Sequence, residues 1–230
     1  MNIIRTKDSH LFLYDNKKVF VIDLGYNDGS FERDISKIYQ TYEYVALEAN
    51  PFFKATIKAK LFNYAIADES NLNIKFGVDN NNSGASSSIF LKNKKIIDIK
   101  SISLKDLYKL STFEKVDILK IDIEGSEYSI LNEENISFLS KNTEQILIEF
   151  HSVKEYSKKI NLILRLFKKN NFYLKKFSFF NKESNCDVYT LLNKNLMSIN
   201  FYLKIKLTTF KYYKGILRFL ERILKKYSVI

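Results

Sequence analysis

The stretch VDILKIDIEG, residues 116–125, decides the fold of this chain of 230 residues. It is a strongly apolar run that ends in a glycine turn, which predicts a buried strand leading into a loop. A second run of the same form, VFVIDLG, occupies residues 19–25. An acid inside such a strand is costly to bury unless it is paired, so Asp122 in the first run is a candidate functional residue.

Further strands and helices alternate around these two runs. Strands are expected at 42–49, 61–67 and 144–151, and helices at 30–40, from Pro51 onward, at 104–111, from 126 onward and at 154–171. This alternation predicts an α/β fold with a doubly wound, mostly parallel sheet. Residues 72–78 and 95–102 look like a strand-rich insertion, and residues 172–180 and 187–193 would close the sheet as a C-terminal antiparallel hairpin.

The positive charge of the chain is concentrated at its C-terminal end. The net charge is +11, which suggests an anionic partner such as nucleic acid, anionic lipid or a phosphorylated substrate. Residues 195–230 carry +7 of it, so we divide the chain into a domain, 1–194, and a basic C-terminal extension, 195–230. Apolar and basic residues recur at helical spacing over 216–227, which predicts an amphipathic helix. Such a helix suits an anionic membrane surface, contacted through 199–230, but also a face packed on the domain.

Cysteine and histidine usage excludes several kinds of site. A single cysteine, Cys186, permits neither an intrachain disulfide nor a cysteine-based metal cluster, and two histidines, His10 and His151, exclude a three-histidine metal site. The first residues contain no apolar stretch of secretory type, and no window of about 20 residues is apolar enough to span a bilayer. We expect a cytoplasmic protein, with the extension as a candidate for peripheral contact with the inner face of the membrane.

The motif DLGYNDG, residues 23–29, follows the first strand and precedes a helix. Glycines there allow a sharp turn and a close approach to a ligand, and the helix N-terminus directs free N–H groups toward it. The motif matches neither GxGxxG nor a P-loop, and a plain strand-to-helix turn is the alternative. Glu48 ends the next strand, where a carboxylate can accept both hydroxyls of a ribose; a solvated strand-end acid is the alternative.

Three ionisable residues lie at the ends of the strands expected at 116–125 and 144–151. Asp122 and Glu124 are two positions apart near a strand end, so they could project to the same side. His151 ends the neighbouring strand and would face the same cleft, where a histidine can act as a general base near neutral pH. The alternatives are a helix cap for the two acids and a structural role for the histidine.

Seven segments occur in the order of a known family: DLGYNDG, LEANP, NYAIAD, SGASSS, ISLKDL, DILKIDIEGSEYSIL and LIEFH. Together, from about Val19 to His151, they resemble the FkbM family of S-adenosylmethionine-dependent O-methyltransferases. The resemblance implies the Rossmann-like sheet of class I methyltransferases and S-adenosylmethionine as cofactor. It also implies roles for seven residues: Asp23, Gly25, Asn27 and Gly29 at the methionine end, Glu48 at the ribose, and Ala65 and Ile66 beside the adenine. Tyr26 replaces the small residue usual in the family, so it could narrow the cofactor site or stack on another group.

Methyl transfer to a hydroxyl requires alignment of the reactants and a group that takes the proton. We expect His151 to take it, while Asp122 and Glu124 orient the histidine or the acceptor. Alternatively, Asp122 and Glu124, with Glu149 as a candidate third ligand, would hold Mg²⁺. We do not favour this arrangement, because the sequence does not place a third ligand clearly. Residues 80–88 are a candidate lid, with a surface turn as the alternative. The resemblance suggests an acceptor hydroxyl on a sugar, surface glycan, glycolipid or metabolite.

Two other functions remain open from the sequence. A nucleic-acid methyltransferase is suggested by the charge, but the excess lies in the extension and the chain has no N/D-P-P-Y motif. The second is a non-catalytic protein with a methyltransferase-like fold. The presence of the expected cofactor acids, Asp23 and Glu48, argues against it. The sequence does not reveal the oligomeric state.

Overall fold

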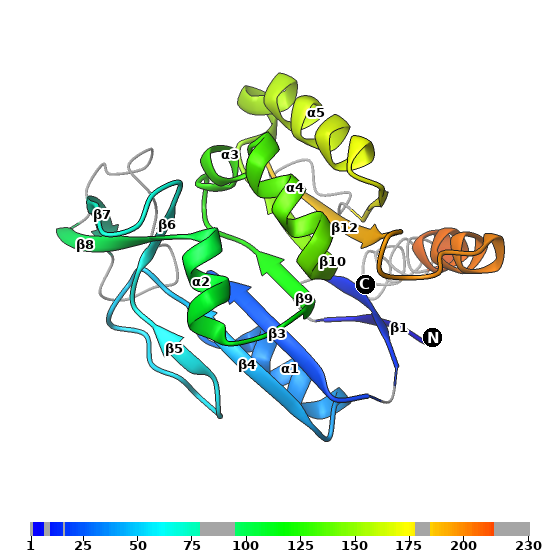
Figure 1. Cartoon of the computed structure of the whole chain (residues 1–230), viewed down its shortest axis with the longest axis horizontal. Helices are drawn as coiled ribbons and strands as arrows, with labels where there is room; N and C mark the ends of the chain where they lie inside the picture. Colours follow the sequence, from blue (N-terminus) through cyan, green and yellow to red (C-terminus); the bar gives the residue numbers. More distant parts are fainter. Residues whose placement is uncertain (1, 7–9, 16, 79–94, 178–184, 214–230) are drawn as a thin grey trace, which may run out of the picture. The chain divides into compact units, whose positions relative to one another are not determined.

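The computed structural model describes residues 2–6, 10–15, 17–78, 95–177 and 185–213 (Figure 1). The chain divides into two compact units, Met1–Met197 and Ser198–Ile230, and in the second unit residues 201–213 are helical. The proposed lid, 80–88, and the amphipathic pattern, 216–227, lie outside the described residues, and the boundary after residue 194 stays a prediction. None of the helices in the described ranges is long and apolar enough to cross a membrane.

The first unit is built on a sheet of seven strands in the order β11-β12-β10-β9-β3-β4-β5 (Figure 1). The strands are β3 (Val19–Leu24), β4 (Tyr42–Leu47), β5 (Lys60–Phe62), β9 (Val116–Ile121), β10 (Thr143–Phe150), β11 (Phe172–Lys176) and β12 (Asp187–Asn193). From β10 to β5 all neighbours are parallel, whereas β12 is antiparallel to both β10 and β11. The predicted class I methyltransferase sheet, mostly parallel with a C-terminal antiparallel hairpin, is confirmed.

Helices cover both faces of this sheet. They are α1 (Ser30–Ile38), α2 (Leu104–Ser111), α3 (Glu127–Ile130), α4 (Glu133–Asn142) and α5 (Val153–Lys169). In Figure 1, α2 and α4 lie in front of the sheet and α1 lies behind it. Side chains of α2, α4 and α5 pack with one set of alternate strand residues, and those of α1 pack with the other set. Because both faces are covered, the central strands are apolar at nearly every position, which is why they read as continuous apolar runs.

Two smaller sheets flank the central one. Strands β6 (Ala65–Ala67), β8 (Lys95–Ser103) and β7 (Asn73–Val78) form the strand-rich insertion, in the order β6-β8-β7. An N-terminal hairpin, β1 (Asn2–Arg5) with β2 (Leu11–Tyr14), was not predicted from the sequence. The side chain of Gln145, on β10, joins this hairpin to the central sheet. Its amide oxygen accepts from Leu13 N at 2.7 Å and its amide nitrogen donates to Leu13 O at 3.1 Å.

Two local predictions are wrong. The segment that starts at Pro51 contains turns and bends but no helix. Two of its N–H groups donate to side chains: Thr56 N to the Tyr26 hydroxyl and Lys58 N to the Glu32 carboxylate, both at 2.9 Å. These N–H groups therefore do not form the backbone hydrogen bonds of a helix. The expected single strand at 61–67 is two strands, because β5 joins the central sheet while β6 leaves it to pair with β8.

Leu119, in the centre of β9, tests the importance of the buried sheet. It is fully buried, so Leu119→Ala should lower the free energy of unfolding by about 2–5 kcal/mol through lost contacts and a residual cavity. Leu162→Ala on α5, where the side chain is 56% exposed, is the matched control and should change it by less than about 0.5 kcal/mol. Urea unfolding followed by circular dichroism measures both, and equal effects would contradict the assignment of the core.

Candidate active site

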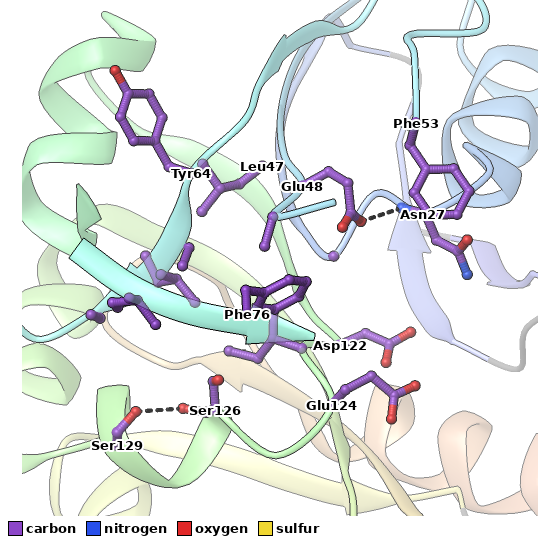
Figure 2. Close-up of a pocket in the computed structure, with 17 residues that line it drawn as sticks. Asn27, Leu47, Glu48, Phe53, Tyr64, Phe76, Asp122, Glu124, Ser126 and Ser129 are labelled. Atoms are coloured by element: carbon purple, nitrogen blue, oxygen red, sulfur yellow. Dashed lines mark hydrogen bonds between the residues drawn. The ribbon is translucent and has the colours of Figure 1, made fainter. Parts of the chain in front are cut away.

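A cavity of about 240 Å³ lies at the carboxyl ends of β3, β4 and β9, beside β6 and β7 (Figure 2). This is the edge at which open α/β sheets bind their ligands. Most of the predicted site residues line it, namely Gly25, Asn27, Glu48, Ala65, Ile66, Asp122 and Glu124. Its remaining wall includes the aromatic side chains of Phe53, Tyr64 and Phe76. The cavity is thus apolar on the side of β6 and β7 and acidic at Glu48, after β4, and at Asp122 and Glu124, after β9.

The backbone contact between Gly25 and Asp122 shapes one end of the cavity. Gly25 has a φ of +86°, and a Cβ there would lie 1.8 Å from the carbonyl oxygen of Asp122, so only glycine fits. The amide of Gly25 also donates to the Leu47 carbonyl at 2.9 Å, and Asp122 N donates to Leu24 O at 3.0 Å. The ends of β3, β4 and β9 are therefore joined by backbone hydrogen bonds directly below the cavity.

The carboxylate of Glu48 is fixed by two backbone amides. Its Oε2 accepts from Asn27 N and its Oε1 from Asn50 N, each at 2.8 Å. Burial raises the pKa of this carboxyl, and the two hydrogen bonds only partly oppose the rise. Each oxygen retains a second acceptor position, so Glu48 can still accept hydroxyl groups from a ligand in the cavity.

Asp23 and Gly29 lie outside the cavity wall. Asp23 is fully buried, where it accepts a hydrogen bond from the Tyr44 hydroxyl at 2.6 Å and pairs with Lys120 Nζ at 3.1 Å. A Cβ at Gly29 would lie 2.6 Å from the hydroxyl oxygen of Tyr26, so this glycine accommodates the tyrosine ring. Both residues support the loop that bears Asn27, and their predicted contact with a cofactor stays untested.

Tyr26 does not narrow the cavity. It is buried in the core beside α1, and its hydroxyl donates to Glu32 Oε2 at 2.7 Å. The suggestion that this residue restricts the cofactor site is therefore not supported by its position, since it does not line the cavity.

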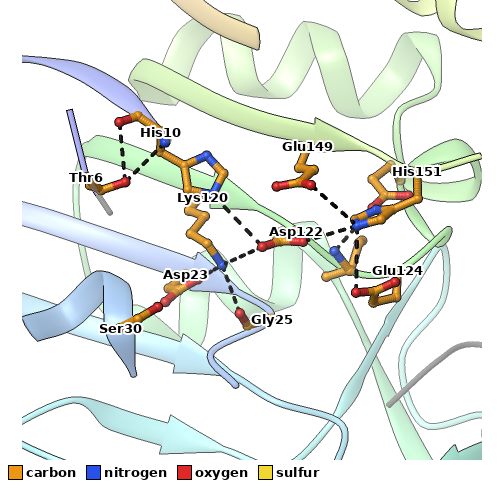
Figure 3. Close-up of polar contacts among 12 residues, drawn as sticks. Thr6, His10, Asp23, Gly25, Ser30, Lys120, Asp122, Glu124, Glu149 and His151 are labelled. Atoms are coloured by element: carbon orange, nitrogen blue, oxygen red, sulfur yellow. Dashed lines mark hydrogen bonds and ion pairs between the residues drawn. The ribbon is translucent and has the colours of Figure 1, made fainter. Parts of the chain in front are cut away.

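The three predicted catalytic residues come together at the carboxyl ends of β9 and β10 (Figure 3). His151 Nε2 lies 3.6 Å from Asp122 Oδ1 and 3.7 Å from Glu124 Oε1. Glu149 Oε1 is 4.0 Å from the same nitrogen. These distances are too long for hydrogen bonds, so Nε2 faces a group of carboxylates without being bonded to any of them.

Glu127 holds the other side of the histidine ring. Its Oε1 lies 2.8 Å from His151 Nδ1, and its two oxygens also accept from the amides of Ile123 at 3.2 Å and Gly125 at 2.9 Å. A carboxylate held in this way orients the imidazole and stabilises its charged form. Burial lowers the pKa of His151, but Glu127, Glu124 and Asp122 outweigh burial and raise the pKa to about 9. His151 is therefore a cation at neutral pH.

Asp122 connects this histidine to a buried lysine and to His10. Its Oδ2 lies 3.4 Å from Lys120 Nζ and 3.9 Å from His10 Nε2. Burial raises the pKa of Asp122, yet the charge of Lys120, with contributions from the two histidines, holds it well below its usual range. Asp122 is therefore an anion throughout the neutral range.

Sequence reasoning missed three members of this cluster, Lys120, Glu127 and His10. Lys120 and Glu127 fall within the quoted segment DILKIDIEGSEYSIL, and a lysine inside an apolar strand carries the same burial cost that singled out Asp122. His10 carried no signal beyond being one of two histidines. Its place depends on the N-terminal hairpin, which sequence reasoning did not predict.

The family model of the methyltransferase FkbM domain matches residues 23–179, more than half of the chain. The chain therefore belongs to the FkbM methyltransferase family, as its motifs predicted. None of the curated protein sequences matches the chain.

Solved structures that match the chain include three proteins of low identity. A precorrin-6y C5,15-methyltransferase from Geobacter metallireducens is 10% identical over 77% of this chain and 82% of its own, with a TM-score of 0.41. A fibrillarin pre-rRNA processing protein from Methanococcus jannaschii is 12% identical over 77% and 67%, with a TM-score of 0.43. A putative methyltransferase from Streptococcus mutans, in complex with SAH, is 9% identical over 77% and 89%, with a TM-score of 0.42. At these values the likenesses carry no argument about activity.

The pKa of His151 is directly measurable, because the chain has only two histidines. NMR titration of the imidazole protons should give a pKa of about 9 for His151, and Glu127→Gln should lower it by removing the nearest negative charge. Because this folded-state pKa exceeds the unfolded value of about 6.5, the group stabilises the fold fully below about pH 6.5. That contribution is lost as the pH rises toward 9.

Glu144→Gln is the control for this titration, because Glu144 lies on the same strand as Glu149 but bonds to Lys17. It should leave the pKa of His151 unchanged. A wild-type value near 6.5, or an unchanged value in Glu127→Gln, would refute the role assigned to Glu127.

Proposed function

We propose that this chain is an S-adenosylmethionine-dependent O-methyltransferase that acts on a hydroxyl of a sugar, surface glycan or glycosylated metabolite. The observation that carries the proposal is the position of His151 and its carboxylates beside a cavity that contains Glu48. The cavity offers groups suited to a nucleoside cofactor, and the cluster offers groups suited to a hydroxyl acceptor. Membership of the FkbM methyltransferase family supports the methyl transfer.

The residues of the cavity fit the parts of S-adenosylmethionine. Glu48 can accept the ribose hydroxyls, and the apolar wall around Ala65, Ile66 and Phe76 suits an adenine ring. Gly25 and Asn27 would lie at the methionine end. When bound, the cofactor supplies a methyl group on a positively charged sulfur, and Asp122 and Glu124 place negative charge on the side of the cavity where the acceptor would approach.

The cluster can take the proton that the acceptor hydroxyl releases. When the acceptor oxygen takes the methyl group that the cofactor would supply, the hydroxyl proton would pass to His151 Nε2. Glu127 holds the ring so that Nε2 faces the cavity side, and Asp122 and Glu124 can accept hydrogen bonds from neighbouring hydroxyls of the acceptor. Only the neutral imidazole accepts a proton, so the reaction depends on the pKa of His151.

The charge of the site favours a neutral polyhydroxylated acceptor. Glu124 is half-exposed and Asp122 lines the cavity, so an approaching substrate meets carboxylates first. Carboxylates bind sugar hydroxyls well but repel the phosphates of a nucleic acid. A nucleic-acid acceptor is therefore the less favoured alternative.

Binding of the cofactor tests the first part of the proposal. Calorimetry should show that S-adenosylmethionine and S-adenosylhomocysteine bind the wild-type protein, and that Glu48→Ala weakens both by at least about tenfold, since hydrogen bonds to a charged group are lost. Glu43→Ala is the matched control, because Glu43 lies on β4, the strand directly before Glu48, but is exposed and pairs with Lys18. A well-folded wild-type protein that binds neither compound would sink the proposal.

The pH profile of methyl transfer tests the role of His151. With a sugar or glycan acceptor, kcat should rise with pH, with the midpoint of the rise near pH 9, as the imidazolium loses its proton. His151→Gln should lower kcat by about 100- to 10,000-fold and abolish this rise, while binding of S-adenosylhomocysteine is retained. A flat profile in the wild-type enzyme would exclude His151 as the base.

A further inference from the structure

His10 is a buried histidine whose ring has no hydrogen bond within the described part of the chain. The residue is 0% exposed, and neither Nδ1 nor Nε2 has a hydrogen-bonding partner there. Its backbone is fixed, because His10 N donates to Thr6 Oγ1 at 3.1 Å and Thr6 N donates to His10 O at 2.9 Å. A buried polar group left unsatisfied is costly, so a ligand that engages this ring would account for it.

The ring of His10 is directed at two carboxylates (Figure 3). Its Nε2 lies 3.9 Å from Asp122 Oδ2, and one nitrogen of His10, one oxygen of Asp122 and one oxygen of Glu149 all lie within 4.8 Å of one another. The distance of 3.9 Å between His10 and Asp122 is too long for a hydrogen bond. It is close to the separation of about 3–4 Å between two ligand atoms that each bind the same ion at about 2.1 Å.

The charge around these residues favours a cation. Five carboxylates belong to the cluster, namely Asp23, Asp122, Glu124, Glu127 and Glu149, and they outnumber the cations Lys120 and His151. Lys120 is also held from its other side by the carbonyl of Gly25 at 2.9 Å. The remaining negative charge would be neutralised by a divalent ion placed between His10, Asp122 and Glu149.

We propose that His10, Asp122 and Glu149 bind a divalent transition-metal ion. An imidazole ligand favours Mn²⁺, Fe²⁺, Co²⁺ or Zn²⁺ over Mg²⁺, which prefers oxygen ligands alone. The inference does not depend on the proposed methyl transfer. Since Asp122 also lines the cavity, the ion would lie beside the site at which the acceptor hydroxyl is expected.

Two neighbouring groups of possible ligands are less suitable. Glu124 and Asp122 could combine with His151, and Glu149 could combine with His151 and Cys186. Neither nitrogen of His10 has a hydrogen bond in the described part of the chain, whereas Nδ1 of His151 is bonded to Glu127 at 2.8 Å. The group with His10 also leaves His151 available as the base next to the metal site.

Titration with Co²⁺ tests the site in the untagged full-length protein after removal of metals by a chelator. The wild-type protein should bind one equivalent at micromolar concentration, with a visible absorption spectrum characteristic of nitrogen and oxygen ligands. His10→Gln and Glu149→Gln should each weaken binding by at least about tenfold, because each removes one ligand. Glu144→Gln, on the same strand as Glu149, is the matched control and should bind Co²⁺ like the wild type.

The proposal is overturned if the wild-type protein shows no saturable binding of Co²⁺, Mn²⁺ or Zn²⁺, or if His10→Gln binds Co²⁺ unchanged. Circular dichroism verifies that the variants fold. Should His10→Gln fail to fold, Co²⁺ must still broaden the His10 imidazole signals in the NMR spectrum of the wild type, and their persistence would overturn the proposal. Calorimetry with S-adenosylhomocysteine separates the two proposals. If the protein binds the metal ion but does not bind S-adenosylhomocysteine, only the cofactor assignment is refuted.

Discussion

The buried ion pair between Asp23 and Lys120 organises the whole site. The two residues are directly paired in the register of β3 and β9, at the point where both strands reach the cavity. Lys120 contacts Asp23, Asp122 and the Gly25 carbonyl, so one ammonium group satisfies two acids and a loop carbonyl at once. Without that charge, burying the carboxylate of Asp23 inside the sheet, close to that of Asp122, would be strongly unfavourable.

The same cluster gives each acid a different task. Asp23 is enclosed and supports the loop after β3, whereas Asp122 reaches the cavity and remains ionised. Glu127 is also enclosed, but it acts on His151 from behind and sets both the direction and the charge of the ring. Glu124 is the most exposed of the four, so it is the acid most accessible to a substrate. Among these four acids, the two enclosed ones therefore position other residues, whereas the two more exposed ones can contact a ligand.

The central sheet was predictable because its strands are buried on both faces and read as uninterrupted apolar runs. The clustering of Asp122, Glu124 and His151 was predictable for a related reason, since neighbouring parallel strands end at the same edge. Contacts between distant segments were not predictable: the amide of Thr56 bonds to Tyr26, which removes a helix that Pro51 suggested. The pairing of Lys120 with Asp23 likewise depends on strand order and register, which no local pattern contains.

The N-terminal hairpin lies before the part of the chain that matches the family domain. The family domain begins at residue 23, yet the hairpin before it delivers His10 to the acidic cluster. Gln145 attaches that hairpin to β10 through two hydrogen bonds, so the domain itself supplies the anchoring point. A change in the segment before the domain would thus leave the sheet and the cavity in place. The surroundings of Asp122 could then change without any change in the central sheet.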